Sequence, residues 1–202
     1  PMSVEEVMSD KLVSWPMTRS MCAPQSDGAG ALVLCSEEAL ARFDRSRAIR
    51  IAGCVLGSGT SRRGDELDRG ASRLAALKAY EMASIGPDDV SVAEIHDATA
   101  FAEILQSESM GFCELGAGGR LVESGRTRLG GSLPINTSGG LLSKGHPTAA
   151  TGAIQMHELV AQLRGEAGER QVSAPRFALA ENGGGFYGFE EAAVTVTILA
   201  KQ

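Results

Sequence analysis

The chain has 202 residues, 43% of them hydrophobic and 22% charged, which is enough apolar sequence to bury the core of one domain or slightly more. A formal net charge of -6 is mild for this length and argues against a nucleic-acid-binding surface. No apolar run approaches the length of a bilayer span and the acidic first residues do not resemble a secretion signal, so we expect a cytoplasmic protein with no membrane segment.

The first part of the chain predicts a short helix and one buried strand. Ser3 and Glu6 have the spacing of a capping box at the start of a helix. The apolar run from Gly30 to Cys35 follows turn residues, as expected for a strand that is covered on both faces of a sheet. The four cysteines have no paired spacing, so we expect reduced thiols in or near the core and no metal site.

From residue 48 onward, predicted strands and helices alternate. Leu74, Leu77 and Met82 form an apolar stripe on one predicted helix, and the next helix is expected to bury Phe101. The polar stretch 57–70 is expected to be a loop. The predicted strands are 49–56, 90–95, 176–180 and 192–199, the last two forming an antiparallel pair, and the helices are 71–84 and 99–110.

The stretch 136–155 combines glycines, a histidine and a helix start more densely than any other part of the chain. Its glycines allow backbone conformations that a Cβ would block, and Pro147 fits the first turn of a helix to about Arg164. This places His146 at the N-terminal end of that helix, where unpaired N–H groups favour negative charge. Such a histidine suits oxyanion binding or proton transfer. The alternative is a tight turn that the histidine merely caps.

Two further polar blocks follow predicted strands. His96 comes directly after the strand 90–95, and the carboxyl ends of strands are a usual place for functional groups in α/β sheets. Glu181 follows the strand 176–180 and precedes three glycines, in the connection to the last strand.

Three of these blocks resemble the thiolase superfamily. The stretch 138–152 is similar to its glycine-histidine-proline motif, in the version of sterol-carrier-protein-like thiolases. The block His96-Asp97-Ala98-Thr99 resembles the histidine-aspartate motif of the same relatives. The block 181–185 lies where the family has a cysteine with three glycines or a related asparagine-glycine sequence. Their order and spacing match the C-terminal half of acetyl-CoA acetyltransferase-like proteins. The resemblance implies an α/β, thiolase-like fold with a mixed five-stranded sheet covered by helices on both faces.

The resemblance also divides the chain into two parts. Residues 1–45, with the motif at 26–29, resemble the incomplete end of the family's N-terminal domain, and residues 46–202 resemble its C-terminal domain. The strand at 30–35 would then lack its neighbours in the sheet and expose an edge unless another polypeptide covers it. We therefore expect a missing N-terminal half or companion subunit, and no activity from this stretch alone.

The resemblance implies roles for the three blocks. His146 and His96 would hydrogen-bond a thioester oxygen, while the N–H groups of Gly183 and Gly184 form a second oxyanion position. His146 could also deprotonate a nucleophilic cysteine, which in the family comes from the first half of the chain. Glu181 could remove a proton next to the carbonyl, or it could be structural and accept backbone N–H bonds. Weaker candidates for substrate contacts are Ser143, Asn136, Tyr187 and Arg62, the last of these more simply part of a solvated loop.

The sequence departs from the family at two positions that carry a catalytic cysteine in relatives, since it has Ala98 and Glu181 there. The resemblance implies an acyltransferase that makes or breaks a carbon–carbon bond next to a thioester, with coenzyme A as substrate and no other cofactor. The alternatives are a retro-aldolase of steroid or aromatic acyl-CoA breakdown, with Tyr187 as acid or base, and a non-catalytic acyl-CoA-binding subunit. Family relatives also imply a homo-oligomer and a small OB-fold, zinc-ribbon partner.

Overall fold

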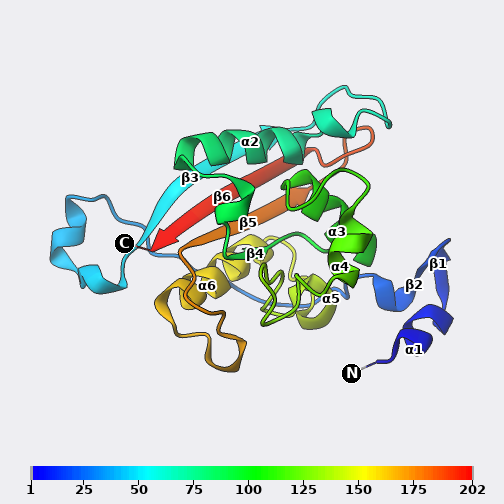
Figure 1. Ribbon diagram of the computed structural model, residues 1–202, viewed down its shortest axis with the longest axis horizontal. Helices are drawn as coiled ribbons and strands as arrows, with labels where there is room; N and C mark the ends of the chain where they lie inside the picture. Colours follow the sequence, from blue (N-terminus) through cyan, green and yellow to red (C-terminus); the bar gives the residue numbers. More distant parts are fainter. Residues whose placement is uncertain (1, 202) are drawn as a thin grey trace.

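The computed structural model describes residues 2–201 and is built around one mixed sheet with the strand order β3-β6-β5-β4 (Figure 1). β6 lies antiparallel to both of its neighbours, and β4 lies parallel to β5. The strand bounds are β3 Ile49–Ser58, β4 Val92–Glu94, β5 Phe177–Gly184 and β6 Ala193–Lys201. The predicted α/β fold is therefore confirmed, with four strands in this sheet instead of five.

The prediction of a strand at 30–35 is wrong. This segment is extended but forms no strand, because within residues 2–201 no strand pairs with it. Its apolar side chains stay in solvent, with Val33 91% and Leu34 72% exposed. At the other edge of the sheet, Ile135 makes a single parallel bridge with Ala93 of β4.

Helices cover both faces of the sheet. α2 (Ala71–Ala83) lies on one face and α6 (Thr151–Arg164) on the other (Figure 1). The side chains of β5 alternate between them, since Leu179 packs in the cluster with α2 and Ala178 packs in the cluster with α6. The three shorter helices are α3 (Ala100–Ser109), α4 (Gly118–Glu123) and α5 (Gly140–Lys144).

The buried face of α2 is made of small residues, because the helix approaches β3 closely. A Cβ at Gly53 of β3 would lie 2.6 Å from the carbonyl oxygen of Ala79. The predicted stripe of larger residues points the other way, with Leu74 40%, Leu77 54% and Met82 59% exposed. Phe101 was also expected to be buried and is 60% exposed on α3. The core-facing residues of α2 are instead four alanines with Ser72 and Tyr80, and those of α3 are Gln106, Ser107 and Glu108.

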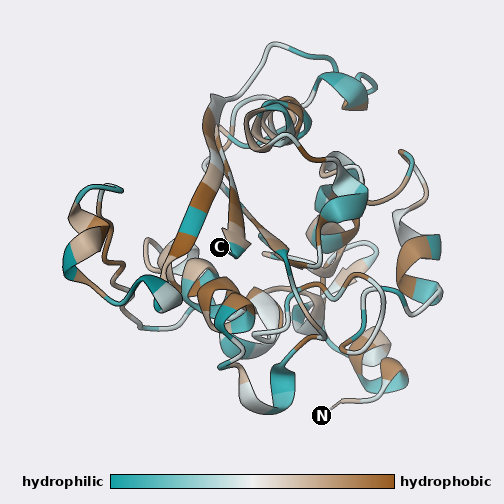
Figure 2. Ribbon diagram, turned by 60° about the vertical axis from the view of Figure 1, so that its left-hand side comes forward, coloured by the Kyte–Doolittle hydropathy of each residue, from teal (hydrophilic) through white to brown (hydrophobic). Residues whose placement is uncertain are grey.

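The N-terminal residues form a small unit beside the main sheet (Figure 1). α1 (Val4–Ser9) begins with the predicted capping box of Ser3 and Glu6, and β1 (Leu12–Ser14) pairs with β2 (Met17–Thr18) in a separate two-stranded sheet. The strands of the main sheet consist largely of apolar residues, whereas the loop that projects at the top of Figure 2 is mostly polar. Short 3-10 turns span Arg19–Met21, Ala39–Arg42, Arg45–Arg47, Leu67–Arg69, Pro87–Asp89 and Gly168–Arg170. Within residues 2–201, no helix is long and apolar enough to cross a membrane.

Candidate active site

The two histidines singled out in the sequence lie side by side. The ring centroids of His96 and His146 are 5.1 Å apart, and the ring planes meet at 78°. His96 follows the end of β4, and His146 follows Gly145, whose φ of +94° turns the chain sharply. The fold thus brings together two blocks that are fifty residues apart in the sequence.

Residues 22–26, which we call the N-terminal strap, join the two histidine blocks by backbone hydrogen bonds. The N–H of Ala23 donates to the carbonyl of Ala98 at 2.9 Å, and the N–H of His146 donates to the carbonyl of Pro24 at 2.8 Å. Ser26 donates its N–H to the His146 carbonyl at 3.4 Å. Sequence reasoning missed this strap, because its hydrogen bonds use backbone atoms. It assigned these residues only to the end of a preceding domain.

His146 is not at the mouth of the helix that the sequence predicted. α6 begins at Thr151, because Ala149 adopts a φ of +73°, which a helix does not allow. The imidazole is instead held by a side chain from the first turn of α6. His146 Nδ1 lies 2.7 Å from the hydroxyl of Thr151, which also lies 3.2 Å from the carbonyl of Pro147.

This arrangement selects the tautomer of His146. The Thr151 hydroxyl has one proton, and when it donates that proton to the Pro147 carbonyl it accepts from the N–H at Nδ1. We assign the tautomer from this hydrogen-bond pattern. The Nε2 atom of neutral His146 then carries the lone pair and can accept a proton.

His96 is held in the neutral form. Burial, with the neighbouring His146 as a smaller cause, lowers the pKa of His96 to about 4. Its Nδ1 is buried and has no hydrogen-bond partner among the described residues. A neutral imidazole keeps one N–H, so His96 can donate a hydrogen bond to an oxygen that gains negative charge without being a strong acid itself.

Glu181 completes the group, and it lies inside β5 instead of in the connection that the sequence predicted. Its side chain has no exposed area. One oxygen, Oε2, accepts the backbone N–H of His96 at 2.9 Å, while Oε1 is buried without a partner in the described chain. Burial raises the pKa of Glu181 to about 8, and the nearby Glu191 and Asp97 act in the same direction. The predicted hydrogen bond from a backbone N–H to Glu181 is therefore present, and Oε1 remains available to take a proton.

Asp97 is a buried carboxyl group next to His96 to which sequence reasoning gave no role. Its carboxylate accepts the N–H of Leu141 at 2.6 Å and that of Leu142 at 3.4 Å, at the start of α5. Burial raises the pKa of Asp97 to about 7. This carboxylate therefore links the His96 block to α5, the helix that leads to His146.

Buried polar side chains hold the turn before α5. Asn136, a predicted substrate contact, accepts the N–H of Ile95 at 2.9 Å and donates to Glu103 at 3.3 Å, with its own φ at +54°. Glu94 accepts the N–H of Ser138 at 2.9 Å, and Lys144 Nζ lies 3.6 Å from Oε2 of Glu94. The polar atoms of Asn136 are thus occupied within the protein.

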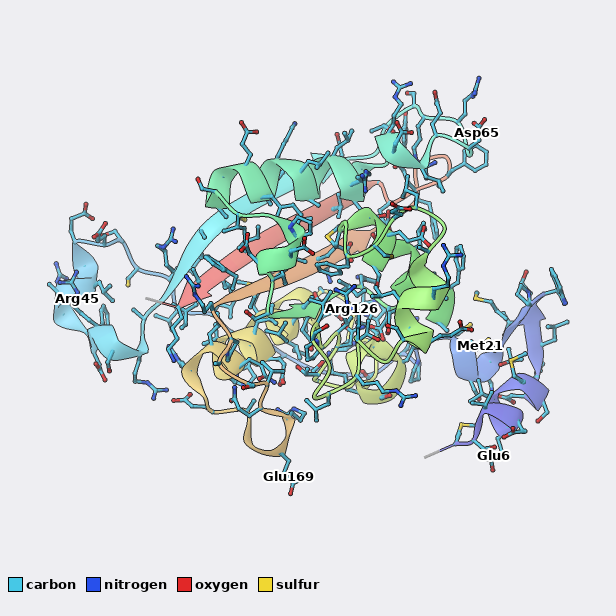
Figure 3. The ribbon with its side chains drawn as sticks, in the orientation of Figure 1. Glu6, Met21, Arg45, Asp65, Arg126 and Glu169 are labelled. Carbon is cyan, nitrogen blue, oxygen red and sulfur yellow. The ribbon has the colours of Figure 1, made fainter. Side chains whose placement is uncertain are left out.

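The other weak candidates lie in different surroundings. Ser143 is exposed on α5. Arg62 forms an ion pair with Glu190 at 3.0 Å, with the two side chains only 6% and 4% exposed. Its remaining nitrogens donate to carbonyls nearby, among them that of Phe189. Tyr187 is half-exposed in the β5–β6 turn. The loop that carries Arg62 projects into solvent at Asp65, as its polar sequence predicted (Figure 3).

The glycine block continues β5. Gly183 and Gly184 pair with Val194 and Ala193 of β6, so Gly185, with a φ of +71°, is the first of the three outside the paired part. Their role in binding an oxyanion stays a prediction. The cysteines were expected in or near the core: Cys113 does pack against the core cluster and Cys22 is partly buried, but Cys35 and Cys54 are exposed. No three acidic, histidine or cysteine side chains of residues 2–201 are grouped to hold a metal ion.

The arrangement has the parts needed to remove a proton next to a carbonyl group. His96 can donate its N–H to the carbonyl oxygen, and His146 can do so once its Nε2 has taken a proton. A buried carboxyl group with a raised pKa is a stronger base than a surface glutamate. A base whose pKa lies near neutral pH transfers protons most effectively under physiological conditions.

Comparisons with known proteins identify the family of the chain. Residues 57–199 match the family model described as thiolase C-terminal domain-like. The chain is 41% identical over 186 residues to the acetyl-CoA acetyltransferase of Methanothermobacter thermautotrophicus. The aligned region covers 91% of this chain and 48% of that protein. It is 38% identical to the benzoylsuccinyl-CoA thiolase subunit BbsB of Thauera aromatica, over 91% of this chain and 48% of the relative.

The chain is also 41% identical to sterol carrier protein 2 of Rattus norvegicus, over 89% of this chain and 34% of that protein. It therefore spans about half the length, or less, of these curated relatives. A solved structure named Ltp2-ChsH2(DUF35) aldolase superimposes with a TM-score of 0.81 at 22% identity, over 100% of this chain and 52% of that one. That likeness shows a shared fold.

Proposed function

The chain belongs to the thiolase family, whose C-terminal domain it contains, and from this premise we propose that it forms the catalytic half of an acyl-CoA enzyme. The reaction makes or breaks a carbon–carbon bond next to a thioester. The observation that carries this proposal is the buried carboxyl group of Glu181, whose Oε1 has no partner in the described chain and which lies beside the histidine pair.

The residues divide the work by their chemistry. His96, neutral at physiological pH, donates its N–H to the thioester oxygen as it gains negative charge, and His146 donates to that oxygen once its Nε2 has taken a proton. Glu181 removes the proton from the neighbouring carbon, and its burial supplies the basicity. Coenzyme A enters as part of the substrate, and no further cofactor is needed for these steps.

Acyl transfer also needs a nucleophile, which we assign to a companion half or subunit outside this stretch. The family resemblance puts Ala98 and Glu181 at the two positions where a catalytic cysteine is expected. These same replacements favour the second candidate, a retro-aldolase, because an aldol cleavage needs an acid, a base and an oxyanion site but no acyl-cysteine. Mass spectrometry of the assembled protein after mixing with acetyl-CoA separates the two. An acyl adduct on cysteine supports the acyltransferase, and none supports the aldolase.

The companion is supported by the relatives. One is named a subunit, and the name of the structural neighbour joins two components, the second of them marked DUF35. We propose that this chain, too, works in an assembly of more than one polypeptide and as an oligomer. The other polypeptide would cover the exposed apolar segment at 30–35.

The proposal is tested by exchange of the α-protons of acetyl-CoA with deuterium from solvent, followed by NMR, on the chain assembled with its companion. We expect Glu181→Gln and His146→Ala to lower the exchange rate by about a hundredfold to ten-thousandfold. His96→Ala should have a smaller effect. Glu123→Gln, on the exposed face of α4, serves as the matched control and should leave the rate unchanged. Wild-type exchange by Glu181→Gln would show that Glu181 is not the base.

A further inference from the structure

Glu181 is sealed from solvent, so a proton that it takes from a substrate must leave through another group. The side chain has no exposed area, and the hydrogen bond that it makes within the described chain holds the His96 backbone. On the opposite face of β5, Asn182 and Gln155 fill the space towards α6 with hydrogen bonds of their own. The way out must therefore lie on the face of β5 that carries Glu181.

Glu191 occupies that face next to Glu181. Residues 181 and 183 of a strand point to the same side of the sheet, but Gly183 has no side chain. A Cβ at Gly183 would lie 2.5 Å from Cγ and 3.2 Å from Oε1 of Glu191. The Glu191 carboxyl group thus takes the space that a side chain at 183 would fill, one position along from Glu181.

On its other side, Glu191 borders a cavity of about 350 Å³ between α2, α3 and the β5–β6 turn. Gln106 Nε2 donates to Glu191 Oε1 at 2.6 Å, and the Ser72 hydroxyl donates to Oε2 at 3.4 Å. Both partners are neutral, so they orient the carboxyl group without pairing its charge. Phe186 and Phe189 stand at the open rim, 96% and 72% exposed.

The other charges around Glu191 are accounted for. Three ionisable side chains line the cavity, and two of them, Arg62 and Glu190, are paired with each other at 3.0 Å. Asp97 is held by backbone N–H groups at α5. Glu191 is therefore the one ionisable side chain of the cavity lining that has no ion-pair partner in the described chain.

We propose that Glu191 relays protons between Glu181 and the solvent of this cavity, an inference that rests on the proposed role of Glu181 as base. The carboxylic acid proton of Glu181 passes to the Glu191 carboxylate. The Glu191 acid then gives the proton to water or to a buffer base in the cavity. Both residues end as carboxylates, ready for the next turnover, and the reverse sequence supplies a proton when a substrate carbon must be protonated.

The relay is tested in the assembled protein with acetyl-CoA in D₂O, comparing Glu191→Gln, Glu191→Asp and the control Glu123→Gln. Without the relay, a proton taken by Glu181 returns to the same carbon, so we expect Glu191→Gln to lower deuterium uptake by about tenfold to a hundredfold. Added formate or imidazole should restore uptake in proportion to its concentration, and Glu191→Asp should keep most of it.

Two results would overturn the relay. One is wild-type uptake in Glu191→Gln. The other is a loss that no small buffer restores and that accompanies a lower melting temperature, which indicates a structural role. Glu181→Gln, measured in parallel, distinguishes the two proposals: if it takes up deuterium at the wild-type rate, the proposed function fails, whatever the behaviour of Glu191.

Discussion

Replacing Glu181 by glutamine should stabilise the protein at alkaline pH while it removes the base. In the folded protein burial raises the pKa of Glu181 from 4.5 to about 8, so the folded state binds a proton that the unfolded chain releases between these values. The stability of the wild type therefore falls as pH rises from about 4.5 through about 8. The full penalty is about 5 kcal/mol, at roughly 1.4 kcal/mol for each pH unit between the two pKa values.

Glutamine fills the same volume and keeps the oxygen that accepts the His96 N–H, but it does not ionise. Urea unfolding of both proteins at pH 6 and pH 9 gives two differences in the free energy of unfolding. About 2 kcal/mol of the penalty is present at pH 6 and nearly all of it at pH 9, so the variant should gain about 3 kcal/mol on the wild type between them. Taking the difference between the two proteins removes the contributions of Asp97 and other groups that titrate in both. An equal difference at the two pH values would refute the raised pKa of the buried Glu181.

Thr151→Val keeps the shape of the side chain but removes the hydroxyl that contacts His146 Nδ1, so we expect turnover to fall about tenfold, with an altered pH profile and nearly unchanged stability. An unchanged pH profile would mean that Thr151 does not set the tautomer. Arg62→Met leaves Glu190 buried without its partner and should lower the free energy of unfolding by about 3 kcal/mol in urea titrations. The double variant Arg62→Met, Glu190→Leu should recover part of that loss, and a single variant as stable as the wild type would show that the ion pair contributes nothing.

The sequence predicted most of the strands and helices because their signals are local. Alternating apolar runs, the capping box of Ser3 and the glycines that end helices are all read within a few residues. The periodicity of α2 did not say which face is buried. The close approach of Gly53 to the backbone of Ala79 selects the alanine face and leaves Leu74 in solvent. That approach depends on a residue of β3 that lies 26 positions earlier in the chain.

The site was predictable in its parts but not in its connections. The resemblance pointed to His96, His146 and Glu181. In the structure the ring centroids of the two histidines are 5.1 Å apart, and Glu181 accepts a hydrogen bond from the His96 backbone N–H. The N-terminal strap could not be inferred, because its hydrogen bonds use backbone atoms and carry no residue signature. The positive φ of Ala149, which moves the start of α6 away from His146, has no sequence signal either.

The most direct test of the account is a crystal structure of the assembled protein with an acyl-CoA analogue in which a methylene group replaces the thioester sulfur. We predict that the carbonyl oxygen of the analogue lies within hydrogen-bond distance of an imidazole nitrogen of His96 or His146. The carbon next to the carbonyl should then lie about 3–3.5 Å from Glu181 Oε1, the separation of reacting atoms in a productive complex. An analogue bound with its carbonyl away from the histidines, or with Glu181 still sealed from it, would contradict the assignment of this site.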